Sequence, residues 1–364
     1  MHLDQKISLK AFHTFGMEVE ARYFVEAKTH SEVLTLLNYR HMIHMPILFL
    51  GGGSNVLFTK DFGGIVIRIN SKGITIREED ENQVLVTAEA GENWDEFVSH
   101  CVDRGWAGLE NLSLIPGTVG AAPIQNIGAY GVEVKDVIEA VQVIEISSGK
   151  QKRYTNAECQ FGYRDSIFKR ELKGKVIILN VTFRLMKVTG VVGDKVTGLQ
   201  GDRVTGQAML KLDYGDIRKE LAAMGIITPE IGAVRNAVCN IRRRKLPDPA
   251  EIGNAGSFFK NPVINHNKLI AIQKTYPDVP FFSQQNNEND QSDLVKVPAA
   301  WLIDQCGWKG FRDGDAGVHP LQPLVLVNYG AANGKQILGL ANRVLESVAE
   351  KFGIRLEMEV NVIG

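Results

Sequence analysis

The sequence lacks features that define several large classes of protein. Its 364 residues include only 4 cysteines, which lie far apart without a CxxC pair, and this argues against a disulfide framework or a zinc site. No apolar run approaches the roughly 18 residues that span a bilayer, and the first residues show no apolar signal-peptide core. Charge of one sign is also missing, because 41 Lys and Arg nearly balance 42 Asp and Glu. We therefore expect a cytoplasmic protein that binds no metal, membrane or nucleic acid.

What is present is ordinary globular composition, with 44% apolar and 23% charged residues but as many as 36 glycines. At roughly 150 residues per domain, the length predicts two or three domains. The first half is rich in strand patterns punctuated by glycine, and the second half mixes helical and strand patterns. This order indicates an α+β fold.

Hydrophobic periodicity predicts the main elements. We expect strands over residues 46–50, 65–69, 84–88, 137–146 and 175–185, and helices over 94–102, 229–244 and 336–352. The alternation of Leu356, Met358, Val360 and Val362 predicts a last strand over 355–363. Three VTG octads over 185–208 are too few for a solenoid, and they indicate a local insertion.

The glycine run Gly51–Asn55 directly follows a predicted strand. Successive glycines there let backbone N–H groups form an anion-binding nest, with Ser54 and Asn55 as further donors. The run matches neither a P-loop nor a Rossmann fingerprint. The alternative interpretation is a tight turn.

A second glycine-rich stretch, Pro116–Gly131, is rich in small residues, namely Gly117, Gly120, Ala121, Ala122, Gly128 and Ala129. Such a stretch lets an extended ligand lie directly against backbone groups. Two small-residue loops separated by strands suggest a dinucleotide bound in extended form. The alternative is an ordinary glycine-rich loop.

Three positions are candidates for catalysis. Arg164, which stands between an aromatic residue and an acidic one, suits a carboxylate or a developing oxyanion, the alternative being a structural Arg–Asp pair. Ser257 follows small residues and precedes two phenylalanines, outside a GxSxG elbow, so proton donor is its better role. Glu359 lies on the polar face of the predicted last strand, where solvent exposure is the alternative.

Seven segments, in order, resemble the UDP-N-acetylenolpyruvoylglucosamine reductase family over nearly the whole chain. They are FLGGGSN (49–55), IPGTVGAAPIQNIGAYG (115–131), YRDSIFK (163–169), RKLPDP (244–249), GNAGSFFKNP (253–262), AAWLIDQCG (299–307) and LEMEV (356–360). The segment LDYGD (212–216) resembles the family branch that carries an extra tyrosine-bearing loop. Asn361 departs from the family, which often has an arginine there.

The resemblance implies a two-lobed FAD-binding domain of the vanillyl-alcohol-oxidase type and a C-terminal α+β substrate-binding domain. It implies lobes over 1–72 and 73–245, with an insertion at 186–210, a substrate domain over 246–354, and a terminal strand over 355–364. The residues that match the family's FAD-binding positions are Gly51, Gly52, Gly53, Ser54, Asn55, Gly117, Gly120, Ala121 and Gly128. The residues that match its substrate contacts are Tyr214, Lys245, Asn261 and Gln322.

The resemblance further implies the reaction. NADPH reduces non-covalently bound FAD, and hydride then passes from flavin N5 to the vinyl carbon of UDP-N-acetylglucosamine enolpyruvate. Arg164 and a neutral Glu359 carboxyl stabilise the developing enolate, while Ser257 supplies the proton. We expect a monomer that takes part in peptidoglycan synthesis and thereby in cell shape and division. Two alternatives stay open: an FAD oxidase of the same superfamily, and a non-catalytic protein that binds flavin or a nucleotide sugar.

Overall fold

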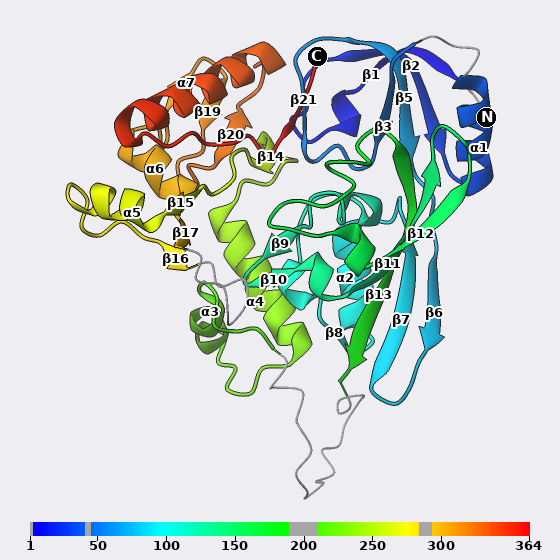
Figure 1. Cartoon of the computed structure of the whole chain (residues 1–364), viewed down its shortest axis with the longest axis horizontal. Coiled ribbons are helices and arrows are strands. Elements are labelled where there is room, and N and C mark those ends of the chain that lie inside the picture. The colour runs from blue at the N-terminus through cyan, green and yellow to red at the C-terminus, as the bar shows by residue number, and fades with distance from the viewer. Residues whose placement is uncertain (1–2, 41–44, 189–209, 284–292) are drawn as a thin grey trace, which may run out of the picture. The chain divides into compact units, whose positions relative to one another are not determined.

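The computed structural model describes residues 3–40, 45–188, 210–283 and 293–364 (Figure 1). Its chain divides into two compact units. Unit 1 comprises residues 1–5, 23–52 and 63–244, and unit 2 comprises residues 6–22, 53–62 and 245–364. The octad insertion falls largely in 189–209, outside the described residues, although its first residues belong to a regular strand.

Two sheets contain most of the described strands of unit 1. The first has the order β1 (Asp4–Ser8), β2 (Glu20–Ala27), β5 (Phe62–Ile69) and β3 (Ile47–Leu50), with helix α1 (His30–Arg40) following β2 along the chain. The second has the order β12 (Gln151–Thr155), β11 (Ile138–Glu145), β13 (Val176–Lys187), β7 (Gln83–Glu89) and β6 (Ile74–Glu78), and β8 (Trp106–Ala107) also pairs with β13. The short strands β9 (Gly128–Ala129) and β10 (Val132–Glu133) pair with each other.

Besides α1, three helices lie in the described part of unit 1. They are α2 (Trp94–Val102), α3 (Ile217–Ala223) and α4 (Ile231–Lys245), whose last residue falls in unit 2, with single 3-10 turns at Glu110–Leu112, Val119–Ala121, Val134–Asp136 and Ala157–Cys159. Helix α2 begins where the side chain of Asn93 accepts a hydrogen bond from Glu96 N–H, and it buries the apolar stripe that its sequence predicts.

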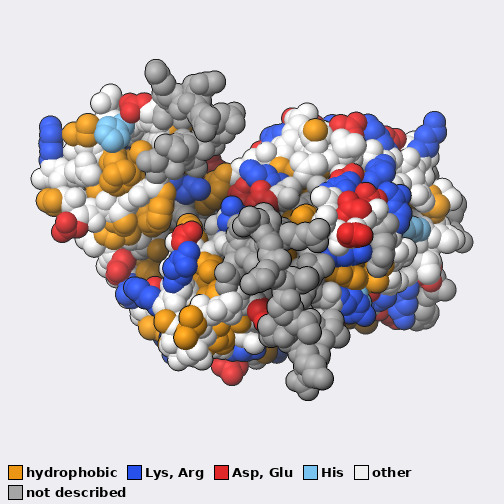
Figure 2. Space-filling view, turned by 90° about the horizontal axis from the view of Figure 1, so that it is seen from below, with side chains coloured by type: hydrophobic (Ala, Val, Ile, Leu, Met, Phe, Trp, Pro, Cys, Tyr) orange, Lys and Arg blue, Asp and Glu red, His pale blue; other side chains and the backbone are white. Residues whose placement is uncertain are grey.

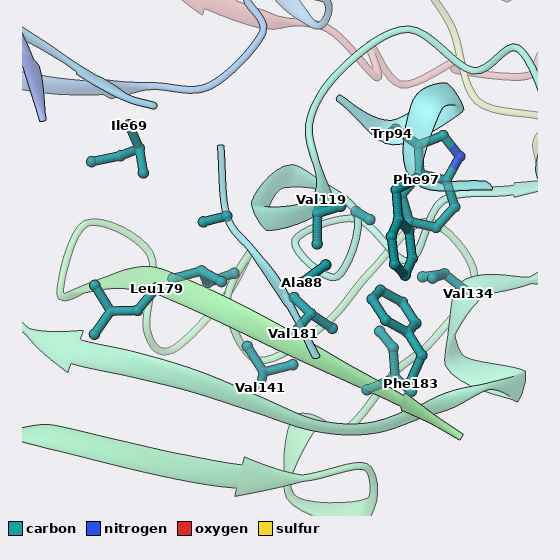
Figure 3. Close-up of a cluster of buried hydrophobic side chains, with 14 of the residues drawn as sticks. Ile69, Ala88, Trp94, Phe97, Val119, Val134, Val141, Leu179, Val181 and Phe183 are labelled. Atoms are coloured by element: carbon teal, nitrogen blue, oxygen red, sulfur yellow. The ribbon is translucent and has the colours of Figure 1, made fainter. Parts of the chain in front are cut away.

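The core of unit 1 joins α2 to the second sheet (Figure 3). The rings of Phe97 and Phe183 lie 4.9 Å apart, and Trp94 packs against both. Val119, from the middle of the second glycine-rich stretch, is fully buried in the same cluster. Ala122 of the same stretch is also buried in this cluster, so the core holds the stretch in place through both side chains.

The described residues of unit 2 form three small sheets and three helices. The sheets have the orders β14 (Gly253–Ser257), β20 (Val325–Asn328), β19 (Ala316–Val318), β18 (Arg312–Asp313); β15 (Val263–Asn265), β17 (Leu294–Lys296), β16 (Phe282–Ser283); and β21 (Asn361–Ile363) parallel to β4 (Val56–Phe58). The helices are α5 (His266–Gln273), α6 (Ala299–Gln305) and α7 (Gly334–Phe352), and a 3-10 turn covers Lys10–Phe12.

The predicted helices and the five earlier strands are confirmed, with no end shifted by more than three residues. The prediction of one continuous last strand over residues 355–363 is wrong. Met358 forms a single bridge with Phe259, and the chain then changes partner, so that Asn361 pairs with Val56 in β4. Because no one ladder runs along residues 355–363, the alternation is not kept, and Val362 is 40% exposed.

The described surface shows no broad region of one charge on the face drawn in Figure 2, where basic and acidic side chains are interspersed. No helix within the described ranges is both long and apolar enough to cross a membrane.

Candidate active site

Gly51 and Gly52 lie against the second glycine-rich stretch, within unit 1. A Cβ on Gly52 would stand 3.0 Å from the Cα of Gly117, and one on Gly51 would stand 2.6 Å from Oγ1 of Thr118. Side chains at these positions would force the two backbones apart. The two loops that the sequence suggests as ligand-binding elements therefore touch, and glycine permits their approach.

Gly120 brings the middle of the stretch close to Ala90, the residue that follows strand β7. Its N–H donates to the carbonyl of Ala90 at 2.9 Å, and a Cβ on Gly120 would stand 2.6 Å from Cβ of Ala90. Ala121 follows in the same 3-10 turn. The two loops therefore offer closely spaced backbone groups, an arrangement that can hold an extended ligand.

Arg164 reaches the far end of this stretch. Its guanidinium donates to the carbonyl of Gly128 at 2.6 Å and to that of Asn126 at 3.4 Å. The neighbouring acidic residue, Asp165, pairs instead with Arg170. Arg164 has a φ of +53°, in the left-handed region that costs a non-glycine residue about 1–2 kcal/mol. Backbone strain of this kind gathers at functional sites, because the surroundings must impose it.

Tyr214 lies beside the same stretch. Its Cβ would be 3.1 Å from a Cβ placed on Gly131, which has a φ of +79°. The fully buried Asn111 joins the two segments, since its amide donates to the carbonyl of Tyr130 at 3.0 Å and to that of Lys211 at 2.8 Å. The structure therefore brings Tyr214 to the second glycine-rich stretch.

Sequence reasoning missed a group of charged residues at the start of the stretch. Asp95 accepts two hydrogen bonds from Arg235 at 2.7 and 3.0 Å, and a third from Leu114 N–H at 2.5 Å. Arg242 donates to the carbonyl of Leu114 at 3.2 Å and lies beside Tyr130. The available signal was the seven-residue spacing of the two arginines, which places them on one face of α4.

In unit 2, the glycine loop continues through Gly53, Ser54 and Asn55. A Cβ on Gly53 would stand 2.0 Å from the carbonyl of Phe12, and its φ is +63°, so the position requires glycine. The amide of Asn55 donates to the carbonyl of Glu359 at 3.2 Å. The carbonyl of Asn55 accepts from the backbone and the side chain of Asn361, both at 3.1 Å.

Ser257 and Glu359 belong to neighbouring backbones of the same unit. Glu359 N–H donates to the carbonyl of Phe258 at 2.8 Å, and Lys260 N–H donates to that of Glu357 at 2.9 Å. Both Ser257 and Glu359 are partly exposed. The structure thus brings the predicted proton donor, the predicted glutamate and Asn55 to one place in unit 2.

The remaining predicted substrate contacts also lie in unit 2. Asn261 accepts a hydrogen bond from Ala299 N–H at 2.9 Å, which satisfies a free donor at the start of α6. Gln322 has a buried Oε1 without a hydrogen-bond partner, an arrangement that costs free energy unless a ligand or water satisfies it. Lys245 is the exposed last residue of α4.

The predicted site residues therefore assemble in two groups, one in each unit. Unit 1 holds Gly51, Gly52, Gly117, Gly120, Ala121, Gly128, Arg164 and Tyr214. Unit 2 holds Gly53, Ser54, Asn55, Lys245, Ser257, Asn261, Gln322 and Glu359. Among the residues that the structure describes, no group of three or more His, Cys, Asp or Glu side chains could hold a metal ion.

Comparison with known proteins agrees with this geometry. A family described as "FAD binding domain" matches residues 21–155, and one described as "UDP-N-acetylenolpyruvoylglucosamine reductase, C-terminal domain" matches residues 248–363. Curated proteins named UDP-N-acetylenolpyruvoylglucosamine reductase are similar over the full length. That of Pseudomonas syringae pv. syringae is 47% identical over 100% of this chain and 99% of its own, and that of Amoebophilus asiaticus is 47% identical over 100% of both.

A solved structure supports the fold. The crystal structure of UDP-N-acetylenolpyruvylglucosamine reductase from Thermus caldophilus is similar with a TM-score of 0.63 and 24% identity, covering 100% of both chains. With the two family matches, this confirms an FAD-binding domain followed by a C-terminal α+β domain. The chain belongs to the UDP-N-acetylenolpyruvoylglucosamine reductase family.

Proposed function

We propose that this protein reduces UDP-N-acetylglucosamine enolpyruvate to UDP-N-acetylmuramate with NADPH, through bound FAD, in peptidoglycan precursor synthesis. The observation that carries the proposal is 47% identity, over the whole chain, to curated reductases of that name. The geometry supports it independently, because the catalytic and cofactor-binding candidates assemble around two touching glycine loops in unit 1 and around Asn55 in unit 2.

FAD supplies the hydride chemistry when it is bound, by accepting hydride from NADPH and passing it to the vinyl carbon of the substrate. The proposed binding residues are those of the two glycine loops. Gly51 and Gly52 let the first loop lie directly against the second, and in this proposal backbone N–H groups of the two packed loops contact phosphate oxygens.

Arg164 binds the substrate carboxylate in this proposal. Addition of hydride to the vinyl carbon places negative charge on the adjacent carbon, and that charge spreads into the carboxylate as an enolate. A guanidinium held by the carbonyls of Gly128 and Asn126 is already oriented, so it stabilises the enolate with little reorganisation. Glu359 is the third proposed catalytic residue, and its backbone lies beside that of the Ser257 segment in unit 2.

Ser257 then delivers a proton to the carbon that carries the negative charge. A hydroxyl is a weak acid, and it therefore protonates a strongly basic carbanion while leaving weaker bases untouched. The pairing of Glu359 N–H with Phe258 supports this assignment, since it keeps the serine and the glutamate on adjacent backbones.

Four residues contact the nucleotide sugar in this proposal: Tyr214, Lys245, Asn261 and Gln322. Gln322 has the clearest structural support, because its buried and unpartnered Oε1 suits a donor on the substrate. Asn261 uses its oxygen to bind α6, so its amide N–H₂ is the group left for the ligand.

We extend the proposal to the setting of the reaction. The protein acts as a cytoplasmic monomer, where NADPH and nucleotide sugars are available, and its product supports cell shape and division. Nucleic acid and membrane are not partners, in keeping with balanced charge and with the interspersed surface in Figure 2. The FAD-binding lobes comprise 1–72 and 73–245, the substrate-binding domain comprises 246–354, and residues 355–364 return to the active site.

Anaerobic half-reactions test the function. The purified yellow protein is reduced with NADPH, and the flavin's visible absorption is then followed after addition of either UDP-N-acetylglucosamine enolpyruvate or air. We expect rapid reoxidation by the enolpyruvate and a product two hydrogens heavier. Reoxidation by air alone would identify an oxidase, and binding without NADPH oxidation would identify a non-catalytic protein. Either result contradicts the proposal.

A further inference from the structure

Leu114 is the residue where the chain enters the second glycine-rich stretch, and its backbone is strained. Its φ is +58°, although leucine strongly disfavours the left-handed region. A strained backbone persists only where its surroundings impose it. The groups that hold Leu114 therefore decide where the stretch begins.

Two charged side chains hold the two polar groups of this one residue. Leu114 N–H donates to Oδ1 of Asp95 at 2.5 Å, and the Leu114 carbonyl accepts from Nε of Arg242 at 3.2 Å. Asp95 belongs to the first turn of α2, and Arg242 belongs to α4. Both bonds are charge-assisted, which makes them stronger than bonds between neutral groups.

Arg235 holds the carboxylate of Asp95 in place. It binds Asp95 through two parallel N–H···O bonds, and the side chains are only 15% and 27% exposed. Burial alone would raise the pKa of the Asp95 carboxyl, but the bonds from Arg235 and Leu114 N–H hold that pKa below its ordinary value. The carboxylate therefore stays charged and acts as a fixed acceptor.

We propose that Asp95, Arg235 and Arg242 are positioning residues that hold Leu114 in its left-handed conformation and thereby place the glycine-rich stretch for FAD. None of the three needs to touch the cofactor for this role. The proposal rests on the proposed function, because it takes the stretch to be the FAD-binding element.

FAD affinity is the direct readout, since it requires no turnover. Without Asp95 we expect Leu114 to relax into an ordinary backbone conformation in most molecules. If the competent conformation falls to about one tenth of molecules, the Kd for FAD rises about tenfold, which corresponds to about 1.4 kcal/mol. Asp95→Ala should show this loss. Asp95→Asn should show a smaller one, because its side-chain oxygen still accepts from Leu114 N–H.

A second substitution separates positioning from general damage. Glycine adopts a positive φ without strain, so Leu114→Gly in the Asp95→Ala background should restore much of the FAD affinity. Glu26→Ala is the matched control, because it removes a partly buried ion pair of 2.7 Å with Arg68, between strands β2 and β5 of the first sheet. It should leave FAD affinity unchanged.

The experiment measures FAD binding by fluorescence titration of each deflavinated variant, alongside its thermal unfolding and its visible spectrum after reconstitution. Wild-type affinity in Asp95→Ala would overturn the proposal, as would an equal loss in Glu26→Ala or failure of Leu114→Gly to restore binding. A wild-type protein that binds FAD but does not reduce the enolpyruvate contradicts only the proposed function. A wild-type protein that binds no FAD overturns both.

Discussion

Glu359 N–H donates to the carbonyl of Phe258 at 2.8 Å, which places a glutamate near the end of the chain beside the residue that follows Ser257. More than one hundred residues of sequence separate the two groups. The bond is reinforced by the contact between Asn55 and the Glu359 carbonyl, so three predicted site segments of unit 2 share one local framework. The proposed catalytic roles of Ser257 and Glu359 rest on this shared framework.

Gly120→Ala should weaken both folding and FAD binding. The added methyl would stand 2.6 Å from Cβ of Ala90, so the glycine-rich stretch must move away from Ala90 at the end of β7. Overpacking of this kind costs about 1–3 kcal/mol, and thermal unfolding together with the flavin content of the purified protein measures it.

Gly232→Ala is the control for that substitution. Gly232 lies in α4, and a Cβ placed there would have nothing within 4 Å, so alanine should stabilise the helix by about 0.5–1 kcal/mol. Equal stability and equal flavin content in the two variants would contradict the close approach of the stretch to the sheet.

Arg164→Ala should slow reduction of the enolpyruvate by about 10²–10³-fold, because it removes a preoriented cation from the enolate. Arg164→Lys keeps the charge but loses the planar fork held by Gly128, and we expect an intermediate rate. Stopped-flow measurement of flavin reoxidation gives these rates.

Arg170→Lys is the matched arginine control, since Arg170 pairs with Asp165 close by in sequence. An exposed ion pair contributes little, about 0–1 kcal/mol, so its rate should equal that of the wild type. Enolpyruvate reduction at the wild-type rate in both Arg164→Lys and Arg164→Ala would exclude a catalytic role for Arg164.

The free energy of unfolding should fall as the pH drops below about 6.5, the ordinary value for histidine. Burial lowers the pKa of His13, although its bond to the Met17 carbonyl acts in the opposite direction. The unfolded chain therefore binds a proton at a higher pH than the folded chain does, and stability is lost from about pH 6.5 downward until the folded pKa is reached. The buried Nδ1 has no partner, so protonation there would bury an unpaired N–H.

His13→Gln should flatten this pH dependence in urea unfolding experiments. A pH profile of His13→Gln with the wild-type slope between about pH 5 and 6.5 would show that other groups cause the loss.

The sequence predicted what depends on local periodicity and on short motifs. The stripe of Trp94, Phe97 and Cys101 correctly predicted helix α2. The small residues of Pro116–Gly131 indicated a stretch without long regular elements, and the described elements of this stretch are indeed short. These features depend on residues close together in the chain, so one sequence is enough to recognise them.

Features that depend on distant pairing could not be predicted. Asp95 and Arg235 are 140 residues apart, and nothing in either neighbourhood indicates that they pair. The left-handed backbone of Leu114 and Arg164 is imposed by such contacts rather than by residue type. The prediction of one continuous terminal strand was wrong for a related reason. The alternating pattern correctly indicated that Leu356 and Val360 are buried, but the segment changes its pairing partner along its length.

The most direct test of the account is a comparison of the two half-reactions in Ser257→Ala. Because the serine supplies only the final proton, NADPH should reduce the flavin at the wild-type rate, while transfer to the enolpyruvate should slow by about 10²–10⁴-fold. Rapid-mixing spectroscopy under anaerobic conditions measures both steps in one protein preparation. Equal loss of both steps, or an unchanged rate of enolpyruvate reduction, would contradict the assignment of Ser257 as the proton donor.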